Sequence, residues 1–163
     1  MAVRQLIAKQ QIEASIDKVW DFISRPENLK KITPPSMGFE ITSPGLPEKM
    51  HAGMIIGYRV RPLAGIPQLW LTEITQVQDL HYFIDEQRVG PYKLWHHQHE
   101  LIPNEKGVLM VDTITYQIPL GGLGEALMGG VVKSKLKGIF KFRESAMMNF
   151  FTAHSAQMQW HKL

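Results

Sequence analysis

The chain has 163 residues, of which 44% are hydrophobic and 20% are charged, the composition of a soluble globular protein and the length of a single domain spanning residues 1–163. The lack of cysteine excludes disulfides and thiolate metal sites, and a formal net charge of only +3, with no basic stripe among aromatic residues, argues against nucleic acid as a partner. No secretion signal and no apolar run long enough to cross a membrane are present, so we expect a cytoplasmic protein without an integral membrane segment.

The chain is predicted to begin with a strand and two short helices. Residues 3–12 alternate loosely between apolar and polar side chains, as a strand does. Ser15 has the character of a helix N-cap, because apolar residues follow it at helical spacing. Pro26 interrupts that helix and starts a second short one, which prolines 34 and 35 end.

A series of strands is predicted next. A short strand at 38–42 is followed by longer ones at 54–61 and 68–78, with Pro- and Gly-rich turns between them. Three more strands lie between His81 and Pro119, joined by Gly90-Pro91 and by the segment 104–107, whose Asn and Gly favour a tight turn. Six or seven sequential strands indicate an antiparallel meander.

The C-terminal part is predicted to be a connection followed by one long helix. The segment 120–124 has the composition of a flexible link and lacks the Lys-Ser/Thr of a phosphate-binding loop. From about Gly130 to the end, apolar residues form a helical stripe with most lysines outside it. Arg143 lies near the centre of that stripe, where a charge needs a partner.

One face of the three strands between His81 and Pro119 mixes aromatic residues with imidazoles and carboxylates. Counting from the turns places His99 opposite Asp112 and His97 opposite Asp85, so that each imidazole meets a carboxylate. A slip of one residue would move all of these side chains to the other face. The same register gives three further pairs: His97 with Ile114, Trp95 with Tyr116, and Phe83 with His99.

Four stretches of this chain resemble a bacterial branch of the SRPBCC superfamily, described as START-like or polyketide cyclase/dehydrase-like ligand-binding domains. They are GMIIGYRVRPLAGIPQLWLTEI, FIDEQRVGPYKLWHHQHEL, MVDTITYQIPLGGLGEAL and IFKFR. The resemblance implies an α+β helix-grip fold, in which a curved antiparallel sheet wraps a long C-terminal helix and leaves a cavity between them. The predicted order of strands and helices agrees with that layout.

A site for a small hydrophobic or amphipathic molecule, lipids included, is predicted in this cavity. The inward face of the sheet and the helix would supply aromatic walls and a few convergent polar groups, as small-molecule sites do. The predicted ligand-binding residues are Tyr58, Trp70, Thr72, Asp85, Gln87, Trp95, His97, His99, Asp112, Tyr116 and Arg143.

Two alternatives use the same pattern differently. An Asp–His general base drawn from His97, His99, Asp112 and Asp85 could serve a cyclase or dehydratase reaction, as in some superfamily members, with Arg143 stabilising an oxyanion. A protein-interaction module without a ligand is the other alternative. We expect no cofactor, and no metal either, because an aspartate opposite each imidazole would simply orient it.

Overall fold

The computed structural model describes residues 3–61, 66–151 and 157–163. The strands are β1 (Arg4–Ile12), β2 (Glu40–Ile41), β3 (Met54–Val60), β4 (Gln68–Gln78), β5 (Tyr82–Val89), β6 (Leu94–Asn104), β7 (Gly107–Gln117) and β8 (Gln157–Lys162). The helices are α1 (Ile16–Ile23), α2 (Gly121–Phe150) and two 3₁₀ helices, η1 (Pro26–Ile32) and η2 (Pro35–Met37).

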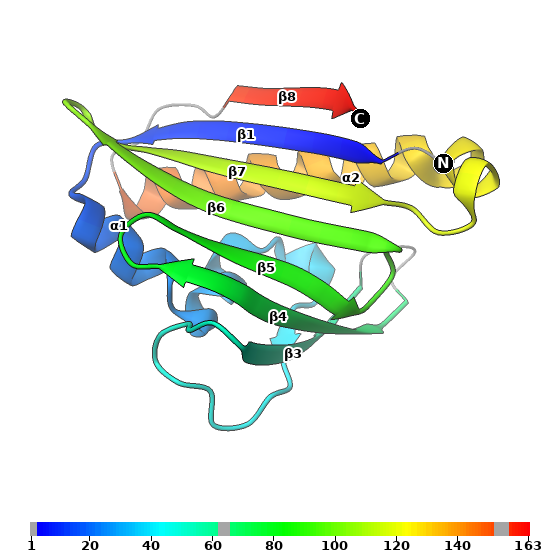
Figure 1. Ribbon diagram of the computed structural model, residues 1–163, viewed down its shortest axis with the longest axis horizontal. Coiled ribbons are helices and arrows are strands. Elements are labelled where there is room, and N and C mark those ends of the chain that lie inside the picture. The colour runs from blue at the N-terminus through cyan, green and yellow to red at the C-terminus, as the bar shows by residue number, and fades with distance from the viewer. Residues whose placement is uncertain (1–2, 62–65, 152–156) are drawn as a thin grey trace.

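The strands form one antiparallel sheet in the order β2-β3-β4-β5-β6-β7-β1-β8. The curved sheet has the long helix α2 along one face, and α1, which follows β1, lies at the C-terminal end of that helix (Figure 1). This is the predicted α+β helix-grip arrangement, with eight strands in place of six or seven. The second short helix is 3₁₀ in geometry.

The predicted register of the central strands is confirmed. Across β5 and β6, Asp85 lies opposite His97, and across β6 and β7, His99 lies opposite Asp112. The other predicted pairs are present as well: His97 with Ile114, Trp95 with Tyr116, and Phe83 with His99. The register follows from tight turns, of which the one after β6 places Gly107 at φ 114°, a conformation that glycine adopts without strain.

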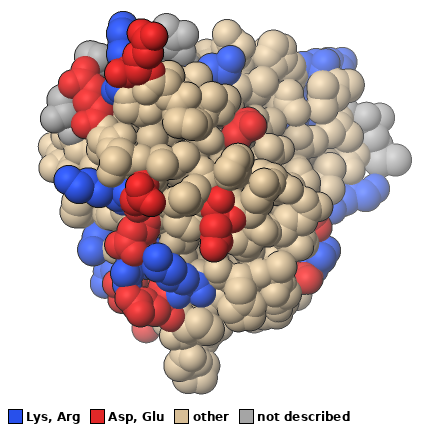
Figure 2. Space-filling model, turned by 60° about the vertical axis from the view of Figure 1, so that its left-hand side comes forward, with Lys and Arg blue, Asp and Glu red and all other residues tan. Residues whose placement is uncertain are grey.

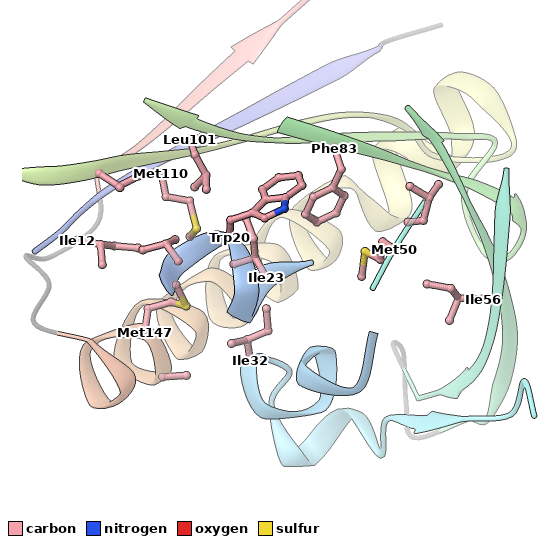
Figure 3. Close-up of a cluster of buried hydrophobic side chains, with 14 of the residues drawn as sticks. Ile12, Trp20, Ile23, Ile32, Met50, Ile56, Phe83, Leu101, Met110 and Met147 are labelled. Carbon is pink, nitrogen blue, oxygen red and sulfur yellow. The ribbon is translucent and has the colours of Figure 1, made fainter. Parts of the chain in front are cut away.

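The core begins where α1 packs into the concave side of the sheet. Trp20 of α1 meets Phe83 of β5 edge-on at a ring-centroid distance of 6.3 Å, with Met147 of α2 in the same cluster (Figure 3). A second cluster lies between β1, β7 and α2, with Ile114 and Leu136 fully buried. These two clusters fix α2 against the sheet at separate places.

The predicted flexible link at 120–124 is wrong, because α2 already begins at Gly121. Leu120, at φ 64°, sets the entry into the helix. A Cβ atom on Gly124 would stand 1.9 Å from the carbonyl oxygen of Pro119, so close packing explains this glycine. The helix therefore begins nine residues earlier than the predicted start at about Gly130.

The predicted helix to the C-terminus is also wrong. Helix α2 ends at Phe150, and the chain returns as β8, which pairs with β1 from Lys9–Gln157 to Arg4–Lys162. Met158 and Trp160 pack against the cluster between β1, β7 and α2. Hydrogen bonding to an open strand edge therefore decides the structure of this segment.

Charged side chains are spread over the surface. On the face in Figure 2, acidic and basic groups lie intermixed among large uncharged areas. The lysines of α2 at 133, 135, 137 and 141 are exposed, as their position outside the apolar stripe predicts. Among the described residues, no helix has both the length and the apolar character that a membrane span requires.

Candidate functional site: a cavity with a buried His–Asp cluster

A cavity of about 200 Å³ lies between the concave face of the sheet and α2. Strands β3 to β6 supply one wall and α2 supplies another, through Val132, Ile139 and Phe140 among others. Residues near η1 and η2 and in the β5–β6 loop complete the lining, including Met37 and Tyr92. Most of these side chains are apolar, so the polar ones stand out.

Aromatic rings make up one side of the cavity. Trp70 stacks on Tyr58 with ring centroids 6.0 Å apart and meets Trp95 edge-on at 5.3 Å. The buried hydroxyl of Thr72 accepts a hydrogen bond from Trp70 Nε1 at 3.0 Å and lies 2.9 Å from the Tyr58 hydroxyl. Burial, and after it the charge of Asp85, raises the pKa of Tyr58, so this phenol stays protonated.

Two imidazoles lie between two carboxylates in the middle of the sheet. His97 Nε2 is hydrogen-bonded to Asp112 Oδ1 at 3.0 Å, and His99 Nε2 to Asp85 Oδ2 at 2.9 Å. The remaining ring nitrogens also face carboxylates: His99 Nδ1 lies 2.9 Å from Asp112 Oδ1 and His97 Nδ1 lies 3.4 Å from Asp85 Oδ2. The hydrogen bonds therefore run diagonally, between residues that are not directly opposite in the register.

Arg143 completes the cluster from α2. Its Nη1 donates to Asp112 Oδ1 at 3.2 Å, and its guanidinium lies 4.9 Å from the Phe140 ring centre. Its Nε is buried and has no hydrogen-bond partner among the described residues. A charge in the apolar stripe of α2 is thus explained by a buried carboxylate on β7.

The cluster sets the protonation of its members. Burial, aided by the charge of His99, lowers the pKa of His97 to about 4. Burial acts on His99 in the same direction, but the contacts with Asp112 and Asp85 outweigh it and raise the pKa of His99. Burial works against ionised carboxylates too, yet Arg143 and the imidazoles hold the pKa of Asp112 well below its usual value, and His97 and His99 lower that of Asp85.

The buried charges cancel while His99 is protonated. In that state Asp85 and Asp112 each carry a negative charge, His99 and Arg143 each carry a positive one, and His97 is neutral. A balanced set of paired charges is the condition under which such groups can remain inside a protein.

The structure places the predicted site residues in two groups. Those that line the cavity are Tyr58, Trp70, Thr72, Asp85, Trp95, His97, His99 and Arg143. Asp112 and Tyr116 lie behind the wall, and Gln87 uses both ends of its amide on the backbone of Tyr92, which holds the β5–β6 loop in place. Apart from Arg143, the lining residues of α2 and those of the loop were not predicted, since strand alternation gives no information about them.

Asp85, His97 and His99 are also potential metal ligands. One ligand atom from each can be chosen so that all three atoms lie within 4.8 Å of one another. The expectation of no metal stays a prediction.

Comparison with known proteins reveals similarity in structure. No protein-family model matches the chain, and no curated protein matches its sequence. Among solved structures, TTHA0849 from Thermus thermophilus is 17% identical with a TM-score of 0.61, over 90% of this chain and 98% of that one. A protein from Arthrobacter aurescens is 14% identical with a TM-score of 0.62, over 89% and 86% of the two chains.

Ara h 8.0201 is similar to the same degree, at 14% identity and a TM-score of 0.60, over 90% of this chain and 99% of that one. Similarity at this level of identity concerns the fold. The chain has the helix-grip fold of SRPBCC-type proteins, as its sequence resemblance predicted.

Proposed function

We propose that the protein binds a small hydrophobic or amphipathic molecule in the cavity between the sheet and α2. The observation that carries this proposal is the distribution of the lining. Aromatic and aliphatic side chains surround most of the space, whereas Asp85, His99 and Arg143 are gathered around Asp112 on one part of the wall, and the exposed Lys135 is a further charged lining residue. A guest with an apolar body and one polar end matches that distribution.

The dimensions suit a small guest. A cavity of 150 Å³ in another protein accepts benzene, so about 200 Å³ is sufficient for a compact ring or a short chain. The rings of Trp70, Tyr92 and Trp95 offer apolar and quadrupolar contacts to such a body.

The polar end of the guest is expected near Arg143. Its Nε–H is a buried donor without a partner among the described residues, which costs about 1–3 kcal/mol as long as it stays unmet. An oxygen atom of a carboxylate or hydroxyl group would accept this hydrogen bond. The feature therefore supports an amphipathic guest over a purely apolar one.

The general-base alternative has weaker support. All four ring nitrogens of His97 and His99 face carboxylate oxygens, so a substrate proton would have to displace one of these contacts. His97, the neutral imidazole, has a pKa of about 4 and is a weak base.

A protein-interaction module without a ligand would be expected to have a collapsed cavity. The described residues instead surround an unfilled cavity of about 200 Å³. Exposed leucines at 120, 123 and 127, at the start of α2, are the remaining support for that alternative.

The test is a matched pair of substitutions on adjacent residues of α2. Val132 is buried and lines the cavity, while the adjacent Val131 is 45% exposed and does not line it. We expect wild type and Val131→Phe to bind 1-naphthoic acid, seen as quenching of tryptophan fluorescence and a rise in melting temperature. Val132→Phe fills the cavity and should bind at least tenfold more weakly while keeping a native circular dichroism spectrum.

Native mass spectrometry of protein purified from its own host provides the second measurement. A co-purifying small molecule that is retained by Val131→Phe and lost from Val132→Phe would support the proposal. Equal binding of 1-naphthoic acid by both variants, together with the absence of any co-purifying molecule, would show that the cavity is not a binding site.

A further inference from the structure

Three nitrogen and oxygen donors converge on the cavity wall. Asp85 Oδ2 lies 2.9 Å from His99 Nε2 and 3.4 Å from His97 Nδ1, and all three residues line the cavity. We propose that Asp85, His97 and His99 form a binding site for a divalent transition-metal ion such as Zn²⁺. This inference does not depend on the proposed guest, because the metal ion alone is the probe that tests it.

The spacing of the donors suits such an ion. Zinc binds histidine nitrogen at about 2.0–2.1 Å and carboxylate oxygen at about 2.0–2.2 Å, which puts neighbouring ligand atoms about 3.0–3.4 Å apart in octahedral or tetrahedral geometry. The two distances from Asp85 Oδ2 fall at or within a few tenths of an ångström of this range, and one donor atom from each of the three residues can be chosen so that all lie within 4.8 Å of one another. Two imidazoles and a carboxylate, without sulfur, suit zinc, iron, cobalt or nickel better than calcium or magnesium.

Asp112 holds the opposite side of both imidazoles. It accepts a hydrogen bond from His97 Nε2 and lies 2.9 Å from His99 Nδ1, so the protons on these nitrogens can be directed away from the cavity. This arrangement leaves His97 Nδ1 and His99 Nε2 as the ligand atoms, on the side of Asp85. Metal-binding histidines commonly have a carboxylate in this position, which fixes the ring and its tautomer.

In this proposal the two aspartates have different roles, whereas the sequence predicted one orienting aspartate for each imidazole. Asp112 serves both rings, and it is the carboxylate that Arg143 contacts. Asp85 has no contact with an arginine or lysine side chain within ion-pair distance among the described residues, and it lines the cavity whereas Asp112 does not. One carboxylate is thus committed to orientation, and the other can act as a ligand.

One contact of the metal-free cluster is unfavourable without a cation. The hydrogen bond between His97 Nε2 and Asp112 turns Nδ1 of the same ring towards Asp85, 3.4 Å from Oδ2, and in the neutral form of the ring this Nδ1 carries a lone pair. Two buried acceptors facing each other are costly, and a metal ion between them removes that cost.

The site would retain an open coordination position towards the cavity. With both imidazoles neutral, as metal ligands are, the divalent ion and Arg143 together would exceed the charges of Asp85 and Asp112 by one positive charge. The open position would consequently favour an anionic oxygen, either hydroxide or a carboxylate.

The test is titration of purified, chelator-stripped full-length protein with Co²⁺ and Zn²⁺. We expect one ion per chain, with a visible Co²⁺ absorption that shows coordination by nitrogen and oxygen, and displacement of Co²⁺ by Zn²⁺. His96 is the matched control, because it is on the same strand and points to the outer face, where it contacts Glu86. His96→Gln should bind as wild type does, while the double variant His97→Gln/His99→Gln should lose saturable binding.

Asp112→Asn separates orientation from ligation, and we expect it to weaken Zn²⁺ binding by about 10–100-fold without abolishing it. X-ray absorption of Zn²⁺-loaded wild type supplies a readout that requires no variant, and it should show two imidazoles in the coordination shell. The proposal is wrong if wild type binds none of Zn²⁺, Co²⁺, Ni²⁺ and Fe²⁺. It is also wrong if the absorption spectrum lacks imidazole, or if the folded double variant binds as tightly as wild type.

Discussion

The stability of the metal-free protein is predicted to have a maximum near pH 6.5, because the two buried imidazoles titrate in opposite directions. His97 is neutral in the folded state with a pKa of about 4, whereas an unfolded histidine has a pKa of about 6.5. Below pH 6.5 the unfolded chain therefore takes up a proton that folded His97 does not, and stability falls with decreasing pH. At 1.36 kcal/mol per pH unit, the loss from pH 7 is about 2 kcal/mol at pH 5 and about 3 kcal/mol at pH 4.

His99 produces the other side of the maximum. Its pKa is raised in the folded state, so the stability that its proton contributes is fully present below pH 6.5 and is lost as the pH rises through the folded pKa. The two carboxylates have lowered pKa values and add a further loss below about pH 4.

The assay is urea unfolding followed by tryptophan fluorescence, with chelator present, at half-unit steps from pH 4.5 to pH 8.5. His97→Gln should remove the acid side of the profile and leave the alkaline side, whereas His96→Gln should change neither. A wild-type free energy of unfolding that stays constant within about 0.5 kcal/mol, the size of one experimental error, between pH 5 and pH 7 would refute the assignment of His97 as a buried neutral group.

Two further substitutions test polar contacts in the cavity wall and directly behind it. Asp112→Asn removes the negative charge that faces Arg143 and both imidazoles. In urea titrations at pH 7 it should lower the free energy of unfolding by about 3–5 kcal/mol, and a loss below about 1 kcal/mol would contradict a buried ionised carboxylate at this position. Thr72→Val leaves the Trp70 N–H and the Tyr58 hydroxyl without their partner and should cost about 1–3 kcal/mol. A double-mutant cycle with Tyr58→Phe should give a coupling energy of at least about 0.5 kcal/mol, and full additivity would disprove the contact.

The polar half of the site follows from the sequence because it depends on local pairing. Short turns fix the register of β5, β6 and β7, and the register alone brings His97, His99 and Asp112 to one face. What the register does not determine is which nitrogen meets which oxygen. Side-chain rotamers select the diagonal hydrogen bonds, and rotamers depend on packing against elements such as Phe83, which stacks on His99 at 4.1 Å.

The sequence-based predictions that are wrong concern segments whose structure depends on contacts with distant parts of the chain. Glycines at 121, 122 and 124 favour a loop by intrinsic propensity, yet α2 includes all three, and at Gly124 the close approach of the Pro119 carbonyl leaves space only for glycine. The final segment has too few residues for its period to be decisive, and the open edge of β1 makes it a strand. In both places tertiary contacts override local preference.

The connectivity of the cluster has a consequence for how the molecule assembles. Asp85, His97, His99 and Asp112 all belong to three consecutive strands joined by short turns, so bringing them together closes only small loops and costs little chain entropy. Arg143 arrives from far along the chain, when α2 docks. Until that step the two acidic groups have only imidazoles and water to compensate them, and the docking of one helix both neutralises the excess charge and seals the interior from solvent.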